Sequence, residues 1–434
     1  MRITKSTFNS SASFPPLTHA QWDVIIIGGG PAGSTAATTL AQAGRRVLVL
    51  EKAKFPRFHV GESLLPYNRK IFEDLGVWDK IETAGFMVKR GAQFIMGNDS
   101  RSVRLDFSKG SFTEYPQSVQ VERSKFDNLL LKHSREQGVE VREECLVLEN
   151  KITEKEVNVR YQDAHGMEHT VTASFLMDAS GLSNFTGTRE SLREYYPGHK
   201  KIAIFGHFEN LDMPQGEEDG DILIVRRENS WFWMIPLEKN KTSVGLVLDR
   251  ADFQKLGQTP EQVYEEAVRN TPAVGKRFME AVSLTSLHVV TDFSYRNERL
   301  ISPRVVRIGD ASGFIDPIFS SGVLLAMTSG QQGAQAVHEA LTSGQAMTKG
   351  MRRYEKDNRA RIAQYWEFIE NFYRKHFAQI FFQPHPRMQM TCSINAVLAG
   401  RTRLSFAAWW RLRVFFILAW LNKRIPITPR IEVN

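Results

Sequence analysis

Several features that mark other protein classes are absent from this 434-residue sequence. It has only two cysteines, Cys145 and Cys392, which excludes a disulfide scaffold or a thiolate metal cluster and fits a reducing compartment such as the cytoplasm. No run of 18 uncharged apolar residues occurs, because Arg411 and Arg413 interrupt the nearest candidate, 404–421. The polar segment 1–20 lacks the apolar core of a secretory signal and is interpreted as a disordered leader.

The sequence also lacks histidines at metal-ligand spacing, and the body of the chain carries little net charge. His59, His207 and His288 are isolated, so no metal site is predicted. The net charge is +8, but the segment 397–434 has seven Lys and Arg residues against Glu432 alone, which is +6. The remaining chain is nearly neutral, so we expect no nucleic-acid partner.

A dinucleotide-binding unit is the clearest signal that is present. The segment WDVIIIGGGPAGSTAATTLAQAGRRVLVLEK (22–52) predicts a strand, a glycine turn, a helix and a second strand that ends at Glu51. Gly28, Gly30 and Gly33 have the GxGxxG spacing, which permits a tight turn, close approach of a pyrophosphate and close helix–strand packing. The helix N-terminus favours phosphate, and Glu51 can accept hydrogen bonds from both ribose hydroxyls.

Two later segments also place a strand before an acidic glycine turn. They are FLMDASG (175–181) and RVVRIGDASG (304–313), and the second leads into a predicted helix that runs to 341. Further helices are predicted around 66–75, 78–84, 123–138 and 260–283, and the chain is predicted to be helical from 350 onward. Alternating segments at 139–149, 154–162 and 169–177 predict a β-meander.

The order of these three segments resembles the FAD-dependent fold shared by aromatic hydroxylases, geranylgeranyl reductases and flavin-dependent halogenases. The resemblance implies that the dinucleotide is FAD, that Asp310 meets its ribityl-pyrophosphate region, and that Arg123 lies near the same phosphates. It implies an α/β fold with a Rossmann-like FAD-binding domain (21–190 and 290–345), an interleaved β-sheet substrate domain (85–120 and 190–290) and a helical, basic C-terminal region (346–434). Since only one nucleotide fingerprint is present, FADH2 is expected from a separate flavin reductase.

Three short motifs narrow the resemblance to flavin-dependent halogenases that act on phenols and pyrroles. They are FPRFHVGESLLP (55–66), WFWMIP (231–236) and FIDPIFSSG (314–322). The second matches the family's WxWxIP motif, so Trp231 and Trp233 are expected to keep the substrate apart from the flavin. Two tryptophans on a strand are more often core packing, but three motifs in the family's order favour the functional interpretation. The resemblance implies chlorination or bromination of an electron-rich ring, free or bound to a carrier protein, by FADH2, O2 and halide.

The resemblance also places a catalytic lysine shortly after the GES motif, and Lys89 in VKRGA occupies that position. Arg90 is expected to be its exposed neighbour. In this family the oxidant is hypohalous acid, which must reach the substrate without escaping into solvent. A buried amine can hold it by a hydrogen bond or form a haloamine, and both alternatives remain open. Burial lowers the pKa of a lysine, which suits the amine role.

The halide is expected at the turn before the helix 323–341. The backbone N–H groups of Ser321 and Gly322 and the helix dipole supply positive potential there, and Ser320 is expected to lie toward Lys89. Tryptophan halogenases carry a glutamate two positions before the residue that matches Ser321, whereas this chain has Phe319. A missing carboxylate favours a ring that halogenates readily, such as a phenol or pyrrole.

Two other functions remain open from the sequence. One is an FAD monooxygenase that hydroxylates an aromatic or polyene substrate, and the other is a docked flavoprotein without turnover. The tail is interpreted either as a C-terminal helix that covers the substrate cavity, or as a docking surface for an acidic carrier protein or, peripherally, an anionic membrane. Asp292 falls where some relatives attach flavin covalently, which denaturation of the yellow protein would test.

Overall fold

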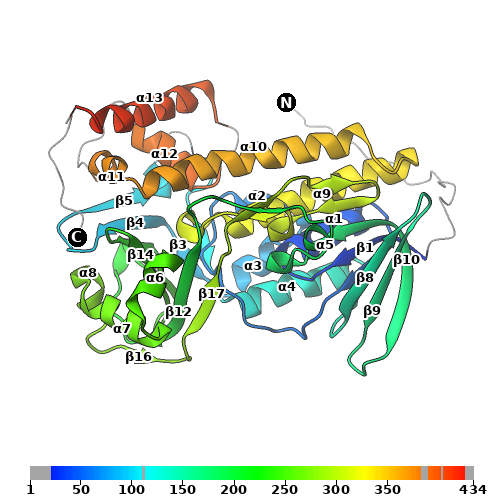
Figure 1. The fold of residues 1–434 in the computed structure, drawn as a ribbon, viewed down its shortest axis with the longest axis horizontal. Helices are drawn as coiled ribbons and strands as arrows, with labels where there is room; N and C mark the ends of the chain where they lie inside the picture. Colours follow the sequence, from blue (N-terminus) through cyan, green and yellow to red (C-terminus); the bar gives the residue numbers. More distant parts are fainter. Residues whose placement is uncertain (1–20, 110–112, 383–389, 402–403, 426–434) are drawn as a thin grey trace.

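The computed structural model describes residues 21–109, 113–382, 390–401 and 404–425. The predicted leader, 1–20, and the end of the basic tail, 426–434, lie outside the described residues. Figure 1 shows one sheet at the right of the molecule and a second at the left, with a long helix, α10 (Lys349–Phe372), running above both.

The first sheet has the strand order β19-β20-β10-β1-β2-β7, and the inner pairs from β20 to β7 are parallel. Its strands are β1 (Trp22–Ile27), β2 (Val47–Leu50), β7 (Glu140–Arg142), β10 (Glu168–Asp178), β19 (Ile301–Ser302) and β20 (Val305–Arg307). Val24 and Ile26 pack under the helices α1 (Pro31–Gln42), α9 (Gly322–Ser343) and α10. Ile25 and Ile27 pack on the hairpin β8 (Leu146–Ile152)–β9 (Val157–Gln162). The continuous apolar run of β1 therefore reflects burial on both faces, and the predicted α/β fold is confirmed.

The second sheet has the order β16-β12-β15-β14-β13-β4-β5, with β17 also paired to β12. Its strands are β4 (Gly91–Met96), β5 (Ser102–Asp106), β12 (Lys201–Glu209), β13 (Ile222–Arg226), β14 (Ser230–Glu238), β15 (Lys241–Asp249), β16 (Val282–Ser283) and β17 (His288–Thr291). One face packs on the helices α7 (Pro260–Arg269) and α8 (Pro272–Gly275). The opposite face turns toward the C-terminal helices and, at its centre, toward a cavity.

Smaller elements connect the two sheets. The helices are α2 (Asn68–Leu75), α3 (Trp78–Thr83), α4 (Arg123–Glu136), α5 (Phe185–Arg189) and α6 (Arg250–Leu256). A two-stranded sheet pairs β3 (Met87–Lys89) with β6 (Ser118–Gln120), and a three-stranded sheet has the order β11 (Arg193–Tyr195), β18 (Tyr295–Asn297), β21 (Gly313–Phe314).

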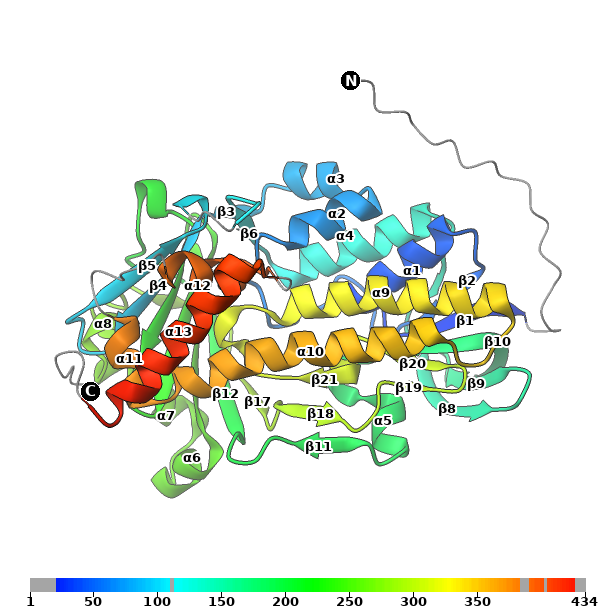
Figure 2. The ribbon, with the colours of Figure 1, turned by 90° about the horizontal axis from the view of Figure 1, so that it is seen from above.

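The C-terminal region is helical, as predicted, and consists of α10, α11 (Lys375–Phe381), α12 (Met390–Leu398) and α13 (Phe406–Asn422). Figure 2 shows α9 and α10 side by side, with α13 near the end of α10. Leu412 and Phe415 of α13 belong to the main hydrophobic core. No described helix is long and apolar enough to cross a membrane.

Two predicted elements are wrong in their bounds. The segment 139–149 is two strands, β7 and β8, that do not pair with each other, because the chain turns at Glu144, whose φ is +56°. The predicted helix 260–283 ends at Arg269, since Pro272 cannot continue the helical hydrogen bonding and starts α8 instead. At Arg90 the chain passes from one sheet to another, so Lys89 ends β3 and the following residues form β4.

Candidate active site

A cavity of about 540 Å³ lies between the two sheets. The glycine turn after β1, the loop 50–63 and the turn after β10 form one end of its wall. Side chains of β12, β13 and β14 and the start of α9 form the other end. The volume lies in the range of ligand sites, and one end is polar and glycine-rich while the other is lined by aromatic and aliphatic side chains.

The polar end contains the GxGxxG turn. Gly28 has φ +100°, and a Cβ on Gly33 would lie 1.9 Å from the carbonyl oxygen of Gly28, so both positions require glycine. A Cβ on Gly30 would meet no protein atom closer than 3.5 Å, yet Gly30 lines the cavity. Gly30 is also the N-cap of α1, whose first N–H groups lack intrahelical acceptors. The turn is therefore shaped to receive an anionic group, as a pyrophosphate requires.

Glu51 lies at the end of β2 on the same wall of the cavity. Its Oε2 accepts the N–H of Gly29 at 2.7 Å and its Oε1 accepts the N–H of Ala53 at 2.9 Å. Each carboxylate oxygen has a second lone pair, so the side chain is fixed in place and still able to accept ribose hydroxyls.

Arg123 and Asp310 face each other across the cavity's polar end. Arg123 is buried, and its guanidinium is held by Asp127 through two hydrogen bonds of 2.7 and 2.9 Å. Burial raises the pKa of Asp310 to about 6, and the charge of Arg123 opposes that rise. A second arginine, Arg57, donates to Asp127 at 3.1 Å and also lines the cavity. This pair of arginines, with the open turn at Gly30, fits the pyrophosphate of FAD.

Lys89 is a buried lysine whose amine has two acceptors. Its side chain is 1% exposed, and Nζ donates to Ser63 Oγ at 2.9 Å and to the carbonyl oxygen of Leu64 at 3.0 Å. Burial lowers its pKa to about 7, against the attraction of Asp221. A neutral amine has two N–H groups and one lone pair, so both N–H groups are satisfied and the lone pair is left for chemistry. Ser63 lines the cavity, and Arg90 is exposed as predicted.

The turn Asp316–Ser321 leads into α9 and carries the predicted halide residues. Asp316 Oδ1 accepts the N–H of Ile318 at 3.0 Å, Ser320 has φ +55°, and Ser321 is the N-cap of α9. Ser320 and Gly322 line the cavity. The amine of Lys89 donates to Ser63 and Leu64, and within the described residues no hydrogen bond joins it to Ser320.

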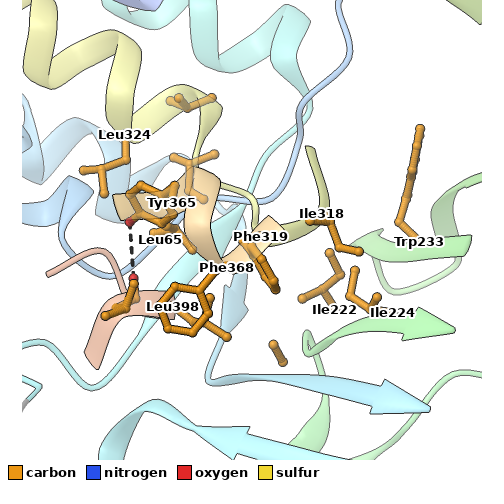
Figure 3. Packing of buried hydrophobic residues seen from close by; sticks show 14 of the residues in the cluster. Leu65, Ile222, Ile224, Trp233, Ile318, Phe319, Leu324, Tyr365, Phe368 and Leu398 are labelled. Carbon is orange, nitrogen blue, oxygen red and sulfur yellow. Dashed lines mark hydrogen bonds between the residues drawn. The ribbon is translucent and has the colours of Figure 1, made fainter. Parts of the chain in front are cut away.

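Phe319 fills the space beside that turn with aromatic packing. Its ring contacts those of Phe94, Phe368 and Phe372 at centroid distances of 6.4, 6.1 and 5.7 Å. Figure 3 shows Phe319 and Ile318 between α10 and the strand residues Ile222 and Ile224. A carboxylate at this position would lose hydration without gaining a partner from these rings.

Trp231 and Trp233 lie on β14 with their indole rings 5.9 Å apart, and both line the cavity. Trp233 Nε1 donates to Ser243 Oγ at 3.2 Å, and its ring rests directly on Gly245, where a Cβ would approach to 2.2 Å. Trp231 Nε1 donates to the hydroxyl of Tyr373 at 2.8 Å. The two rings are thus fixed by hydrogen bonds as well as by packing.

Sequence reasoning missed a buried pair of which one residue, Glu62, lines the cavity. His207 Nε2 lies 2.8 Å from Glu62 Oε1, although the two residues are 145 positions apart. His288 stacks on Phe58 at 4.4 Å, and Asp292 pairs with Arg250. Among the described residues, no group of three or more His, Cys, Asp and Glu side chains could hold a metal ion.

The chain is similar in sequence and in structure to known proteins, and these include FAD-binding proteins and halogenases. The family model for the FAD binding domain matches residues 21–369. The chain is 32% identical over 398 residues to the 1H-pyrrole-2-carbonyl-(peptidyl-carrier protein) chlorinase of Pseudomonas fluorescens, covering 85% of this chain and 87% of that protein. It is 31% identical over 356 residues to the tryptophan 2-halogenase of Chondromyces crocatus, covering 81% and 67%. The structure of the myxobacterial chondrochloren halogenase CndH matches with a TM-score of 0.77 and 29% identity over 93% of this chain and 91% of that one.

Proposed function

Since the chain belongs to the flavin-dependent halogenase family and binds FAD, we propose that it installs chlorine or bromine on a pyrrole or phenol ring held by a carrier protein. The observation that carries this proposal is the position of Lys89. Its amine lies behind Ser63 at the wall of one cavity, which joins the polar glycine turn to the chamber lined by Trp231 and Trp233. The polar end would hold FAD, and the aromatic end would hold the ring.

Each group at the site has a role in this proposal. FAD, when bound and reduced by a separate reductase, would supply two of the four electrons that O2 takes up; the halide supplies the other two, so that hypohalous acid and water form. Ser321 and Gly322 bind the halide through backbone N–H groups at the start of α9. Trp231 and Trp233 separate the ring from the flavin, so that oxygen is not transferred directly to the substrate.

Lys89 carries the halogen in the proposed reaction. The lone pair of the neutral amine takes the halogen from hypohalous acid: the N–X bond forms, the O–X bond breaks, and one N–H proton leaves with the hydroxide as water. The ring carbon then takes the halogen from nitrogen, and the proton lost from that carbon replaces it on nitrogen, which regenerates the amine. A lone pair whose neighbouring N–H groups are both held, as at Ser63 and Leu64, points in one direction and so delivers the halogen with defined geometry.

The side chain of Phe319 and the substrates named for two relatives together indicate the substrate class. The chlorinase of Pseudomonas fluorescens acts on a carrier-bound pyrrole, and the enzyme of Chondromyces crocatus acts on tryptophan. Position 319 holds a phenylalanine that packs in a cluster of phenylalanines, so no carboxylate at this position assists the reaction as a base. A pyrrole or phenol is electron-rich enough to react without that assistance, and this favours it over tryptophan.

The test of the substrate class compares free and tethered rings. We expect pyrrole-2-carbonyl bound to a carrier protein to gain halogen when incubated with the enzyme, FADH2, O2 and bromide, and tryptophan to remain unchanged. Mass spectrometry of the carrier-bound and free compounds measures both. Halogenation of tryptophan in preference to the carrier-bound pyrrole would contradict the assignment from Phe319.

We also propose that α13 contributes a docking surface for the carrier protein. Phe406, Trp409, Ile417 and Trp420 are exposed at spacings that place them on one helix face, while Leu412 and Phe415 are buried. Lys423 and Arg424 follow on the exposed end of the helix. An apolar face beside cations fits an acidic protein partner whose binding is weakened by salt. Among the described residues, none of α13 lines the cavity itself, and Leu412 and Phe415 pack in the same core cluster as Trp231.

Surface variants test this docking better than truncation does. Removing the chain after Gly400 exposes the core around Leu412 and Phe415, so we expect precipitation. The double variant Trp409→Ser, Trp420→Ser is expected to fold and bind FAD but to raise the KM for the carrier-bound substrate about tenfold, the equivalent of roughly 1.4 kcal/mol. Leu256→Ser, at similar exposure on α6, is the control. An unchanged KM, or loss of binding to anionic vesicles instead, would contradict carrier docking.

A further inference from the structure

Three side chains from distant parts of the chain, two of them buried and the third partly exposed, form one hydrogen-bonded series. Trp231 Nε1 on β14 donates to the hydroxyl of Tyr373 at 2.8 Å, and that hydroxyl donates to Asp316 Oδ2 at 2.7 Å. Tyr373 is the C-cap of α10, in the C-terminal region, and Asp316 begins the turn before α9. The series therefore joins the wall of the cavity to the turn through a residue that belongs to neither.

The hydrogen bonds in this series are complete only when all three residues are present. A tyrosine hydroxyl has one O–H to donate, which goes to Asp316, and it accepts the N–H of Trp231. Asp316 uses its other oxygen to accept the N–H of Ile318. Trp231 is 1% and Asp316 2% exposed, so both partners of the hydroxyl are buried although Tyr373 itself is partly exposed. Burial raises the pKa of the Asp316 carboxyl, and the hydroxyl of Tyr373 opposes that rise.

The two ends of the series have different consequences. Asp316 caps the short helical turn Pro317–Phe319, which is followed by Ser320 in the left-handed region and by Ser321, the N-cap of α9. The direction of the first N–H groups of α9 depends on this turn. At the opposite end, the ring of Trp231 forms part of the cavity wall. One hydroxyl therefore fixes the turn at a set position relative to the wall.

We propose that Tyr373 is a positioning residue that holds the halide turn against the Trp231 wall, so that α10 sets both halide affinity and retention of the oxidant. The proposal rests on the proposed role of Ser321 and Gly322 in halide binding. Tyr373 touches neither the halide nor the ring, and it acts through Asp316 and Trp231. Its loss should change halide binding without changing FAD binding, since the glycine turn and Glu51 have separate partners.

The test compares two tyrosines of the α10 segment. Tyr373→Phe removes both hydrogen bonds of the series, and Tyr365→Phe removes one buried bond, from its hydroxyl to the carbonyl oxygen of Val397 at 3.2 Å. Figure 3 shows Tyr365 on the side of α9 and α12, away from Trp233. We expect Tyr373→Phe to raise the KM for bromide about tenfold or more, as two unsatisfied buried groups imply. The KM for the aromatic substrate should change little, and more hypobromous acid should reach a scavenger in solution. Tyr365→Phe should match the wild type in all three.

Each outcome decides the proposal. An unchanged bromide KM in Tyr373→Phe overturns it, and so does an equal rise in both variants, which would indicate general loosening of α10. If Tyr373→Phe cannot be purified, Asp316→Asn replaces it, because an amide nitrogen cannot accept the tyrosine proton; it should give the same rise. If the wild type makes no halogenated product, the proposed function fails. Crystals soaked in bromide then test the positioning role alone. An anomalous peak at Ser321–Gly322 that is present in the wild type and absent from Tyr373→Phe supports that role. Equal peaks in both proteins, or no peak in either, overturn it.

Discussion

Replacement of Lys89 by alanine is expected to lower halogenation by at least about 100-fold, the range that a single acid–base or nucleophilic group contributes. The amine is the group that would carry the halogen, and its two N–H groups are held by Ser63 and Leu64. FAD binding should persist, because Lys89 lies outside the glycine turn and donates to neither Glu51 nor Asp310. Consumption of O2 should also persist, with the oxidant escaping to a scavenger.

The pH dependence of the wild type offers a second readout of the same residue. Burial lowers the pKa of Lys89 to about 7, so the amine is charged below that pH and neutral above it. Transfer through the lone pair requires the neutral form, and the halogenation rate should therefore rise through about pH 7 and then level.

Lys89→Met keeps the apolar stem and guards against a folding defect, and Arg90→Ala is the exposed control. Halogenation retained by Lys89→Met would remove the lysine from the mechanism.

Gly30→Val is expected to fold and to lose FAD. The added side chain meets no protein atom closer than 3.5 Å at its Cβ, but it enters the cavity where the pyrophosphate approaches α1. We expect affinity to fall by at least about 1,000-fold, or roughly 4 kcal/mol. Flavin absorbance of the purified protein measures occupancy, and circular dichroism establishes the fold.

Gly33→Val provides the contrast for this experiment. Its Cβ would lie 1.9 Å from the carbonyl oxygen of Gly28, a clash within the protein that should destabilise α1 against β1 whether or not FAD is present. A folded Gly30→Val protein with full flavin occupancy would contradict the placement of the pyrophosphate at this turn.

The parts of the fold that sequence could predict are those specified by local pattern. The apolar run of β1, the glycine spacing and the acid that ends β2 lie within 31 consecutive residues, and each has a local physical reason. The burial of Lys89 was predicted from the resemblance, and its neighbour Arg90 is exposed as expected. The division of 139–149 was missed because an extended residue and a left-handed one, here Glu144, look alike in the hydrophobic pattern.

The parts that sequence could not predict depend on tertiary contacts. Ser63 and Lys89 meet because a bridge at Ser63 pairs with β6, which also pairs with β3. Glu62 lies in a loop and His207 on β12, and neither has a spacing that indicates the other. Tyr373 follows a long amphipathic helix, and its position in the sequence indicates only ordinary side-chain packing. Its pairing with Asp316 depends on how α10 lies over the second sheet, which only the folded chain shows.

The most direct test of halogenation measures the mass of the aromatic product with and without halide. Carrier-bound pyrrole-2-carbonyl is incubated with the enzyme, FADH2 and O2, once with bromide and once with no halide. Halogenation predicts the bromine isotope doublet in the first product and unchanged substrate in the second. A product that gains oxygen in either sample, or that gains neither bromine nor oxygen in the presence of bromide, would contradict it.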